Sequence, residues 1–249
     1  AYIYRRLESK HAQMVAGLDY CFSSAKNSFK INDFINLFWL EPGLKRSIDK
    51  IYEIVVYAIF CTIVGELEAT ITVTINPDKI SVLKNFEGFS EKILCINEKS
   101  LSYTGPARLF RVGVTNAADR GLDMWANWGP AIQIKHLALD EALAENVVSS
   151  VASDRIIIVC KSAEKNIIYS LINQLGLKSR IQSIVTEDEL VSWYETALRG
   201  AYAQSMGDNL LNTIREEIQR EFPSSVKGKF SDFYAERDYA SLNDDLWVC

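Results

Sequence analysis

The chain has 249 residues, of which 48% are hydrophobic and 24% are charged, and its formal net charge is −5. This apolar content suffices for one large core, or for a core with an appendage, while the acidic balance argues against DNA binding through overall charge. Two histidines and five scattered cysteines without a C-x-x-C pair argue against a zinc site, a Ser-His-Asp hydrolase and a disulfide framework.

The first third of the chain predicts helices followed by a strand. Residues 1–40 are expected to be helical, with an apolar second helix before the breaker Glu41-Pro42-Gly43. Residues 47–68 predict a long buried helix, and its apolar run from Ile54 to Val64 is too short to span a bilayer. The alternating residues 69–75 predict a strand, and residues 79–104 predict short strands.

Strands and helices alternate in the remainder of the chain. Expected strands cover residues 109–114, 131–137, 155–160 and 181–185, and expected helices cover 140–149, 163–175, 190–198 and 208–222. Thr186 and Glu189 form a capping box before the third of these helices. The order predicts an α/β fold with a mixed central sheet flanked by helices. A doubly wound nucleotide-binding fold would need a G-x-G-x-x-G or P-loop motif, and neither occurs.

The main chemical signal is Asp123 followed, across a turn at Asn127–Pro130, by Gln133-Ile134-Lys135. Alternate side chains of a strand share a face, so Gln133 and Lys135 are expected on one side, and Ile132, Ile134 and His136 on the other. Asp123 and the Gln133 carbonyl would be oxygen ligands for Mg²⁺, and Lys135 would orient water and stabilise the phosphate. The spacing alone is a weak signal, since Glu8-Ser9-Lys10 repeats it, and a half-exposed strand without chemistry is the alternative.

The block Val112–Leu137 resembles type II restriction endonucleases of the HaeII kind, within the PD-(D/E)XK nuclease superfamily. The resemblance implies a PD-(D/E)XK nuclease-like core and a Mg²⁺-dependent enzyme that cuts double-stranded DNA at a short, near-palindromic site. It further implies a homodimer in the bacterial cytoplasm, with a cognate DNA methyltransferase as companion. Gln133 departs from the usual Glu, so either one ion suffices or another acid assists.

Three regions are expected. Residues 1–42 would form a helical N-terminal region, and residues 43–199 the nuclease core. Residues 200–249 would form a C-terminal helical and loop extension that contacts DNA or dimerises.

Glu53 is the candidate for the additional acid. Superfamily relatives often place an acid beside the metal in the helix before the first core strand, and Glu53 lies between Tyr52 and Ile54. An exposed helix face is the ordinary location of a Glu, and Glu66 and Glu68 are competing candidates.

DNA contacts are expected from residues upstream of Asp123. Asn116 and Arg120 are candidate base readers, and Arg108 and Arg111 are candidate phosphate contacts. A turn in which Asn116 bonds to its own backbone is the alternative. Recognition from the C-terminal segment with Lys227, Lys229 and Arg237 also stays open.

Two other functions remain possible from the residues. One is a PD-(D/E)XK nuclease of repair or recombination, which would not need base-specific contacts. The other is a non-catalytic binding or scaffold protein in which Asp123 and Lys135 form a buried salt bridge.

Overall fold

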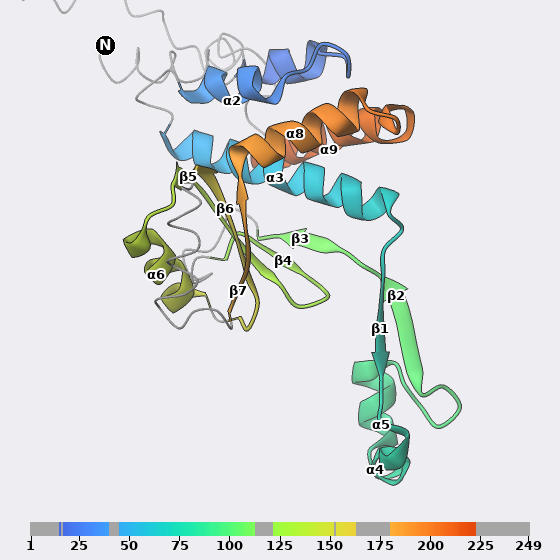
Figure 1. Cartoon of the computed structure of the whole chain (residues 1–249). Coiled ribbons are helices and arrows are strands. Elements are labelled where there is room, and N and C mark those ends of the chain that lie inside the picture. The colour runs from blue at the N-terminus through green and yellow to red at the C-terminus, as the bar shows by residue number, and fades with distance from the viewer. Residues whose placement is uncertain are drawn as a thin grey trace, which may run out of the picture.

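The computed structural model describes residues 15, 17–39, 45–112, 122–151, 153–162 and 180–222. Within these residues a five-stranded mixed sheet forms the centre of the molecule, in the order β3-β4-β5-β6-β7 (Figure 1). Its strands are β3 (Leu109–Arg111), β4 (Met124–Ala126), β5 (Ala131–Ala138), β6 (Ile156–Ser162) and β7 (Ile181–Thr186). The pairs β3/β4 and β4/β5 are antiparallel, and β5/β6 and β6/β7 are parallel. The predicted α/β class with a mixed central sheet is confirmed.

The β4–β5 hairpin closes through the turn that the sequence predicts. Gly129 has a φ of +116°, a conformation that favours glycine, and its N–H donates to Ala126 O over 2.9 Å. Asn127 secures the turn to the preceding loop, since its side chain accepts from Arg108 N over 2.9 Å. This hairpin sets the register of β4 against β5.

One face of the sheet is covered by a layer of helices. These are α3 (Lys45–Glu66), α8 (Glu187–Arg199) and α9 (Ala203–Glu221), and α2 (Ile31–Trp39) packs on α3 and α8 from the outside (Figure 1). The apolar faces of α3, α8 and α9 share one core with Ile132 and Ile134 of β5. Tyr194 of α8 is fully buried in this core and donates to Val55 O of α3 over 2.8 Å. The capping box of Thr186 and Glu189 opens α8, as predicted.

The opposite face of the sheet is covered by α6 (Glu141–Ser150), which links β5 to β6 (Figure 1). Asp140 caps this helix by accepting from Leu143 N over 2.8 Å. Its residues Ala144 and Val147 pack against Ala131 and Ile158 in a second core. The central sheet therefore lies between two helical layers.

An arm projects from the body between α3 and β3 (Figure 1). It consists of the antiparallel strands β1 (Thr70–Thr74) and β2 (Ser102–Pro106), joined through η1 (Pro77–Lys79), α4 (Ile80–Asn85), α5 (Glu87–Phe89) and the π-helix η2 (Ser90–Leu94). The short strands expected throughout residues 79–104 are therefore wrong for residues 80–94. Leu83, Phe86, Phe89 and Ile93 recur every three or four residues, which is a helical period. The strand predicted over residues 69–75 does form as β1, but it pairs with β2 outside the central sheet.

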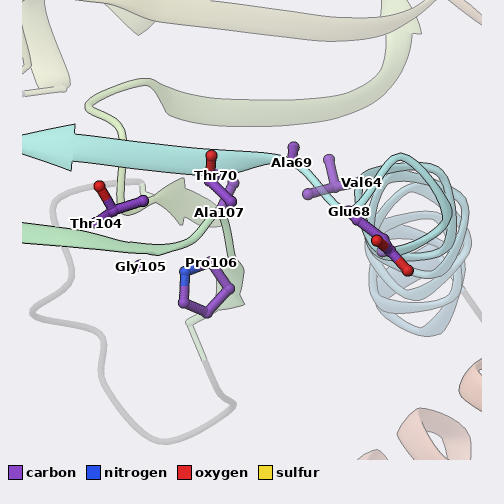
Figure 2. A pocket seen from close by; sticks show the side chains of 9 residues that line it. Val64, Glu68, Ala69, Thr70, Thr104, Gly105, Pro106 and Ala107 are labelled. Atoms are coloured by element: carbon purple, nitrogen blue, oxygen red, sulfur yellow. The ribbon is translucent and has the colours of Figure 1, made fainter.

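The base of the arm contains a hollow of about 440 Å³, which Figure 2 shows beside the end of α3. It is lined by Val64, Gly65, Glu68, Ala69, Thr70, Thr104, Gly105, Pro106 and Ala107. Glu68 has a φ of 46°, so the chain leaves α3 through a left-handed residue before it enters β1. The side chains around this hollow are mainly apolar, and it lies apart from the residues that the sequence predicts to be catalytic.

Several expectations meet the limits of the described residues. The helix expected over residues 163–175 lies outside them, and so do Asn116 and Arg120. The strand expected over residues 109–114 is observed from Leu109 to Arg111. The division at residues 42 and 199 stays a prediction, although α2 and α9 both pack against α3.

The described part contains no helix long and apolar enough to cross a membrane, and its cysteines Cys21, Cys61, Cys95 and Cys160 are all free thiols.

Candidate active site

Asp123 lies where β4 stops pairing with β5. The last paired residue of β4 is Met124, opposite Ile132. Asp123 is the residue before Met124, and its Oδ2 accepts a hydrogen bond from the backbone N–H of Ile134 over 2.7 Å. The same oxygen accepts a hydrogen bond from Gln133 Nε2. The carboxylate therefore satisfies an amide of β5 that β4 no longer reaches.

Gln133 is a polar side chain inside the molecule, with 1% of its surface exposed. Its Nε2 donates to Asp123, while its Oε1 is buried and accepts no hydrogen bond from the described residues. A buried acceptor without a partner costs about 1–3 kcal/mol. A cation in contact with Oε1 would remove this cost, so the amide oxygen suits a metal ligand.

Lys135 completes the predicted trio. It is partly buried on β5, and its positive charge lowers the pKa of Asp123. The alternation along β5 is as predicted, because Ile132 and Ile134 belong to the core against α3. His136 also lies on that side, with its ring 4.8 Å from that of Tyr52 and its Nε2 3.3 Å from Glu187 Oε2. Gln133 and Lys135 are thereby left on the other side of the strand.

Burial raises the pKa of the Asp123 carboxyl above its ordinary value of 3.8. The N–H of Ile134 and the charges of Lys135 and Lys50 oppose this effect, and Asp49 adds to it. Asp49 and Lys50 belong to the first turns of α3. The N-terminal part of α3 therefore lies within electrostatic reach of Asp123.

Of the three candidate acids, Glu53 of α3 is the one whose carboxyl lies within electrostatic reach of Asp123. It is 6% exposed, and its pKa is raised by burial and, further, by the charge of Asp123. Lys50 holds it with contacts of 2.8 and 2.9 Å to the two carboxylate oxygens. Of the competing acids, Glu66 binds Ser205 Oγ over 2.5 Å at the other end of α3, about 20 Å away at 1.5 Å per residue. Glu68 lies beyond that end, at the base of the arm.

Lys50 was not among the site residues predicted from the sequence. Its spacing of three residues from Glu53 on a helix is the signal that could have identified it, because side chains three apart share a face. The two form an ion pair in which Lys50 is about one-third exposed. Lys50 therefore adds a second positive charge near Asp123, in addition to that of Lys135.

Arg111 was predicted from the sequence to be a phosphate contact, but its side chain is buried among acidic residues. Its side chain is 7% exposed and contacts Glu221 over 2.8 Å, Glu217 over 3.0 Å and Glu53 over 3.8 Å. Arg220 binds the second oxygen of Glu217 over 2.6 Å. This buried ion cluster joins β3 to α9 and to α3, so it leaves the Arg111 guanidinium little access to a phosphate.

Arg108 stands in contrast to Arg111. Its side chain is exposed in the loop between β2 and β3. Four residues were predicted from the sequence to contact DNA, and two of them, Arg108 and Arg111, are described in the structure. Of these two, Arg108 is the one that is open to solvent.

The donor set fits a single hard divalent cation. Within the described part of the chain, no group of three or more His, Cys, Asp or Glu side chains gathers around a common point. The candidate ligands are instead one carboxylate, Asp123, and one amide oxygen, Gln133 Oε1, with Glu53 nearby but paired with Lys50. Oxygen ligands of this kind are those that Mg²⁺ and Ca²⁺ prefer.

Comparisons with known proteins agree on one family. The family model described as HaeII restriction endonuclease matches residues 1–239. The chain is 50% identical over 244 residues to the type II restriction enzyme HaeII of Haemophilus aegyptius, which covers 98% of this chain and 69% of that protein. It is 52% identical over 240 residues to the type II restriction enzyme NgoBI of Neisseria gonorrhoeae, which covers 96% and 68% respectively. No solved structure matches the chain.

Proposed function

The chain belongs to the HaeII restriction endonuclease family, and we propose that it cleaves double-stranded DNA at a short, near-palindromic site with Mg²⁺ as cofactor. Its relatives are named type II restriction enzymes. The observation that carries the proposal is the pairing of the Asp123 carboxylate with the buried Gln133 side chain, whose Oε1 has no partner among the described residues.

Asp123 and Gln133 would hold the cation through a carboxylate oxygen and Oε1. A divalent ion there would lower the pKa of a bound water and neutralise charge on the scissile phosphate. The two hydrogen bonds from Gln133 and Ile134 fix the Asp123 side chain, so the carboxylate needs little rearrangement when a cation arrives. Burial raises the carboxyl pKa, and a cation would favour the charged form again.

Lys135 would act on the phosphate and on the attacking water. Its position two residues after Gln133 puts its side chain on the same side of β5. An ammonium group there can orient the water for in-line attack and stabilise the charge that develops on the phosphate oxygens. Its influence on the pKa of Asp123 supports this placement.

Glu53 is proposed as the assisting acid that compensates for the neutral Gln133. Its carboxylate is balanced by Lys50 in the absence of a cation. A cation near Asp123 would compete with Lys50 for Glu53, and Lys50 would then be available to a DNA phosphate. Glu53 would thus become available to the cation when its ion pair with Lys50 opens, while Arg111 remains a more distant partner at 3.8 Å.

DNA recognition requires local positive charge, because the net charge of −5 opposes binding as a whole. Arg108 is proposed as a phosphate contact on account of its exposure. Asn116 and Arg120 are proposed as base readers from their residue types, and both lie outside the described residues. Arg111 is proposed to position α9 and Glu53 instead of binding phosphate. A homodimer and a companion methyltransferase are further parts of the proposal.

The two alternatives are less well supported. A nuclease of repair or recombination would not account for relatives that are named as restriction enzymes. A scaffold protein held by an Asp123–Lys135 salt bridge is disfavoured because Asp123 Oδ2 binds Gln133 and Ile134 instead.

A digest of plasmid DNA tests the proposal. With Mg²⁺ or Mn²⁺, discrete fragments are expected; with Ca²⁺, binding without cleavage; and in excess EDTA, no cleavage. A smear would indicate a nuclease without site preference. Robust cutting in EDTA would remove the metal-dependent mechanism, and no cutting under any condition would favour the scaffold.

A binding experiment in Ca²⁺ separates the two kinds of DNA contact. Loss of Arg120 is expected to cost about 1–3 kcal/mol on the cognate site and to relax preference at one symmetric pair of positions. Loss of Arg108 is expected to weaken all sequences alike and to reduce the dependence on salt. A uniform loss for Arg120→Ala would reassign that residue to the DNA backbone.

A further inference from the structure

The tip of the arm exposes a row of large apolar side chains. Val82, Phe86, Phe89 and Ile93 are between 52% and 65% exposed. They follow one another at intervals of four, three and four residues. Val82, Phe89 and Ile93 belong to α4, α5 and η2, and Phe86 lies at the junction of α4 and α5. We call these four residues the tip stripe. Leu83 and Ile96, by contrast, are buried.

The arm has little material of its own to cover the tip stripe. Its base is a two-stranded ribbon, and most side chains on both strands are exposed. Val73 and Tyr103, directly opposite each other in the ribbon, are a further exposed apolar pair. Figure 1 shows α4 and α5 at the far end of the ribbon, away from the central sheet and from α3. An isolated two-stranded ribbon is marginally stable in water, so further burial would stabilise the arm.

The charges of the tip indicate which kind of surface would cover it. Between residues 76 and 100 there are four acidic and four basic side chains, so this segment has no net charge: Asp78, Glu87, Glu91 and Glu98 against Lys79, Lys84, Lys92 and Lys99. DNA and anionic membranes select an excess of cations. Exposed aromatic and aliphatic side chains among mixed charges are typical of a protein interface.

The exposed area is of the size that two copies of the tip would need. A fully buried aromatic side chain removes about 150–250 Å² from water, so Phe86 and Phe89, each about 60% exposed, offer roughly 200–300 Å² per copy, to which the smaller Val82 and Ile93 add. Two copies, with their polar rims, reach about 1,000 Å², which is the lower limit for a specific interface. A segment with equal numbers of acidic and basic side chains is also complementary to itself.

We propose that the tip stripe is a dimerisation surface, which packs against the tip stripe of a second copy of this chain around a two-fold axis. The choice of a second copy of this chain as the partner rests in part on the proposed function, because two cuts in a two-fold DNA site require two active sites. The arm would hold the two nuclease bodies apart at a separation set by the ribbons, and the duplex would lie between them.

The molecular mass in solution tests this surface without DNA or metal. Sedimentation at micromolar concentration should give the mass of two chains for the unmodified protein. Phe86→Ser/Phe89→Ser should give one chain, with the dissociation constant raised on the order of 100-fold or more, since each change occurs twice in the interface. Tyr202→Ser, at an exposed aromatic between α8 and α9, is the matched control and should remain a dimer.

Ile93→Glu, near the other end of the tip stripe, provides an independent variant should the double variant fail to fold. Thermal unfolding of each variant establishes that the body is intact. If the unmodified protein is a monomer, the proposal is overturned. This holds even if the tip variants bind DNA more weakly than the unmodified protein does. Dimers that persist in both folded tip variants would overturn it as well.

Cleavage is measured separately, so that failure of the two proposals can be distinguished. A dimer that fails to cut DNA would leave the tip interface standing and remove the proposed function. If both hold, the monomeric variants, which keep Asp123, Gln133 and Lys135, should nick one strand much faster than they cut both. Tip variants that are monomeric and still cut both strands at the unmodified rate would show that the arm does not assemble the active dimer.

Discussion

The backbone N–H of Ile134 donates to Asp123 Oδ2 over 2.7 Å, at the position where β4 has ceased to pair with β5. The carboxylate thereby takes the place of a strand carbonyl and is held against the side chain of Gln133. Because the hydrogen bond uses the backbone of Ile134, it does not depend on which side chain occupies that position.

Asp123→Asn and Lys135→Ala are each expected to lower cleavage by about 100-fold or more, since each removes a charge that acts on the cation or the phosphate. Folding should be preserved, because Asn can still accept from Ile134 and Lys135 is only partly buried. Rates are compared with Asp154→Asn and Lys30→Ala, which change exposed residues outside the site. A Lys135→Ala enzyme as fast as the unmodified protein would show that the Gln-x-Lys assignment is incorrect.

Gln133→Glu is expected to retain cleavage at a lower Mg²⁺ concentration, because a carboxylate binds the cation more strongly than an amide oxygen. Without metal, the added charge next to Asp123 should destabilise the protein, so Mg²⁺ should raise its melting temperature more than that of the unmodified protein. Gln133→Leu, which keeps an apolar side chain of similar size, should lose cleavage. Titrations of activity and melting temperature against Mg²⁺ measure both effects. Full activity of Gln133→Leu would remove Gln133 from the ligand set.

Stability without metal is expected to fall as the pH rises from about 4. Burial raises the pKa of Asp123 and of Glu53 above their ordinary values of 3.8 and 4.5. The folded state therefore holds protons that the unfolded chain has already released, and the free energy of unfolding decreases until the pH exceeds the raised values. Asp123→Asn should show a shallower decrease over this range, as measured by denaturant unfolding at a series of pH values. Equal slopes for the two proteins would contradict the raised pKa of Asp123.

Mutation of the two neighbouring arginines should affect stability very differently. Arg111→Ala leaves Glu53, Glu217 and Glu221 without their shared cation and is expected to lower the free energy of unfolding by about 3–5 kcal/mol. Arg108→Ala, three residues away and exposed, should change it by less than about 0.5 kcal/mol. Urea unfolding of the two variants measures the difference. Similar small effects for both would mean that the ion cluster contributes little to the fold.

Local patterns accounted for most of the central sheet and its helices. The alternation along β5, the turn around Gly129 and the capping box at Thr186 each act over a few residues, so sequence reasoning could predict them. The arm shows where such reasoning failed. Apolar residues between Ile80 and Leu94 were interpreted as short strands, because a buried strand and a short amphipathic helix are difficult to distinguish from composition.

By itself, the sequence placed Asp123 beside Gln133 and predicted Lys135 on the same side of the strand, because one hairpin spans all three residues and its turn sets their register. The family resemblance was carried by the same short block. Only the tertiary structure decided which acid lies beside that trio and what surrounds Arg111. Arg111 and Glu217 are 106 residues apart in the chain, and they meet because the apolar faces of α3 and α9 share one core. Burial of those faces places the charges together, and no local pattern in the sequence records which helices will pack against each other.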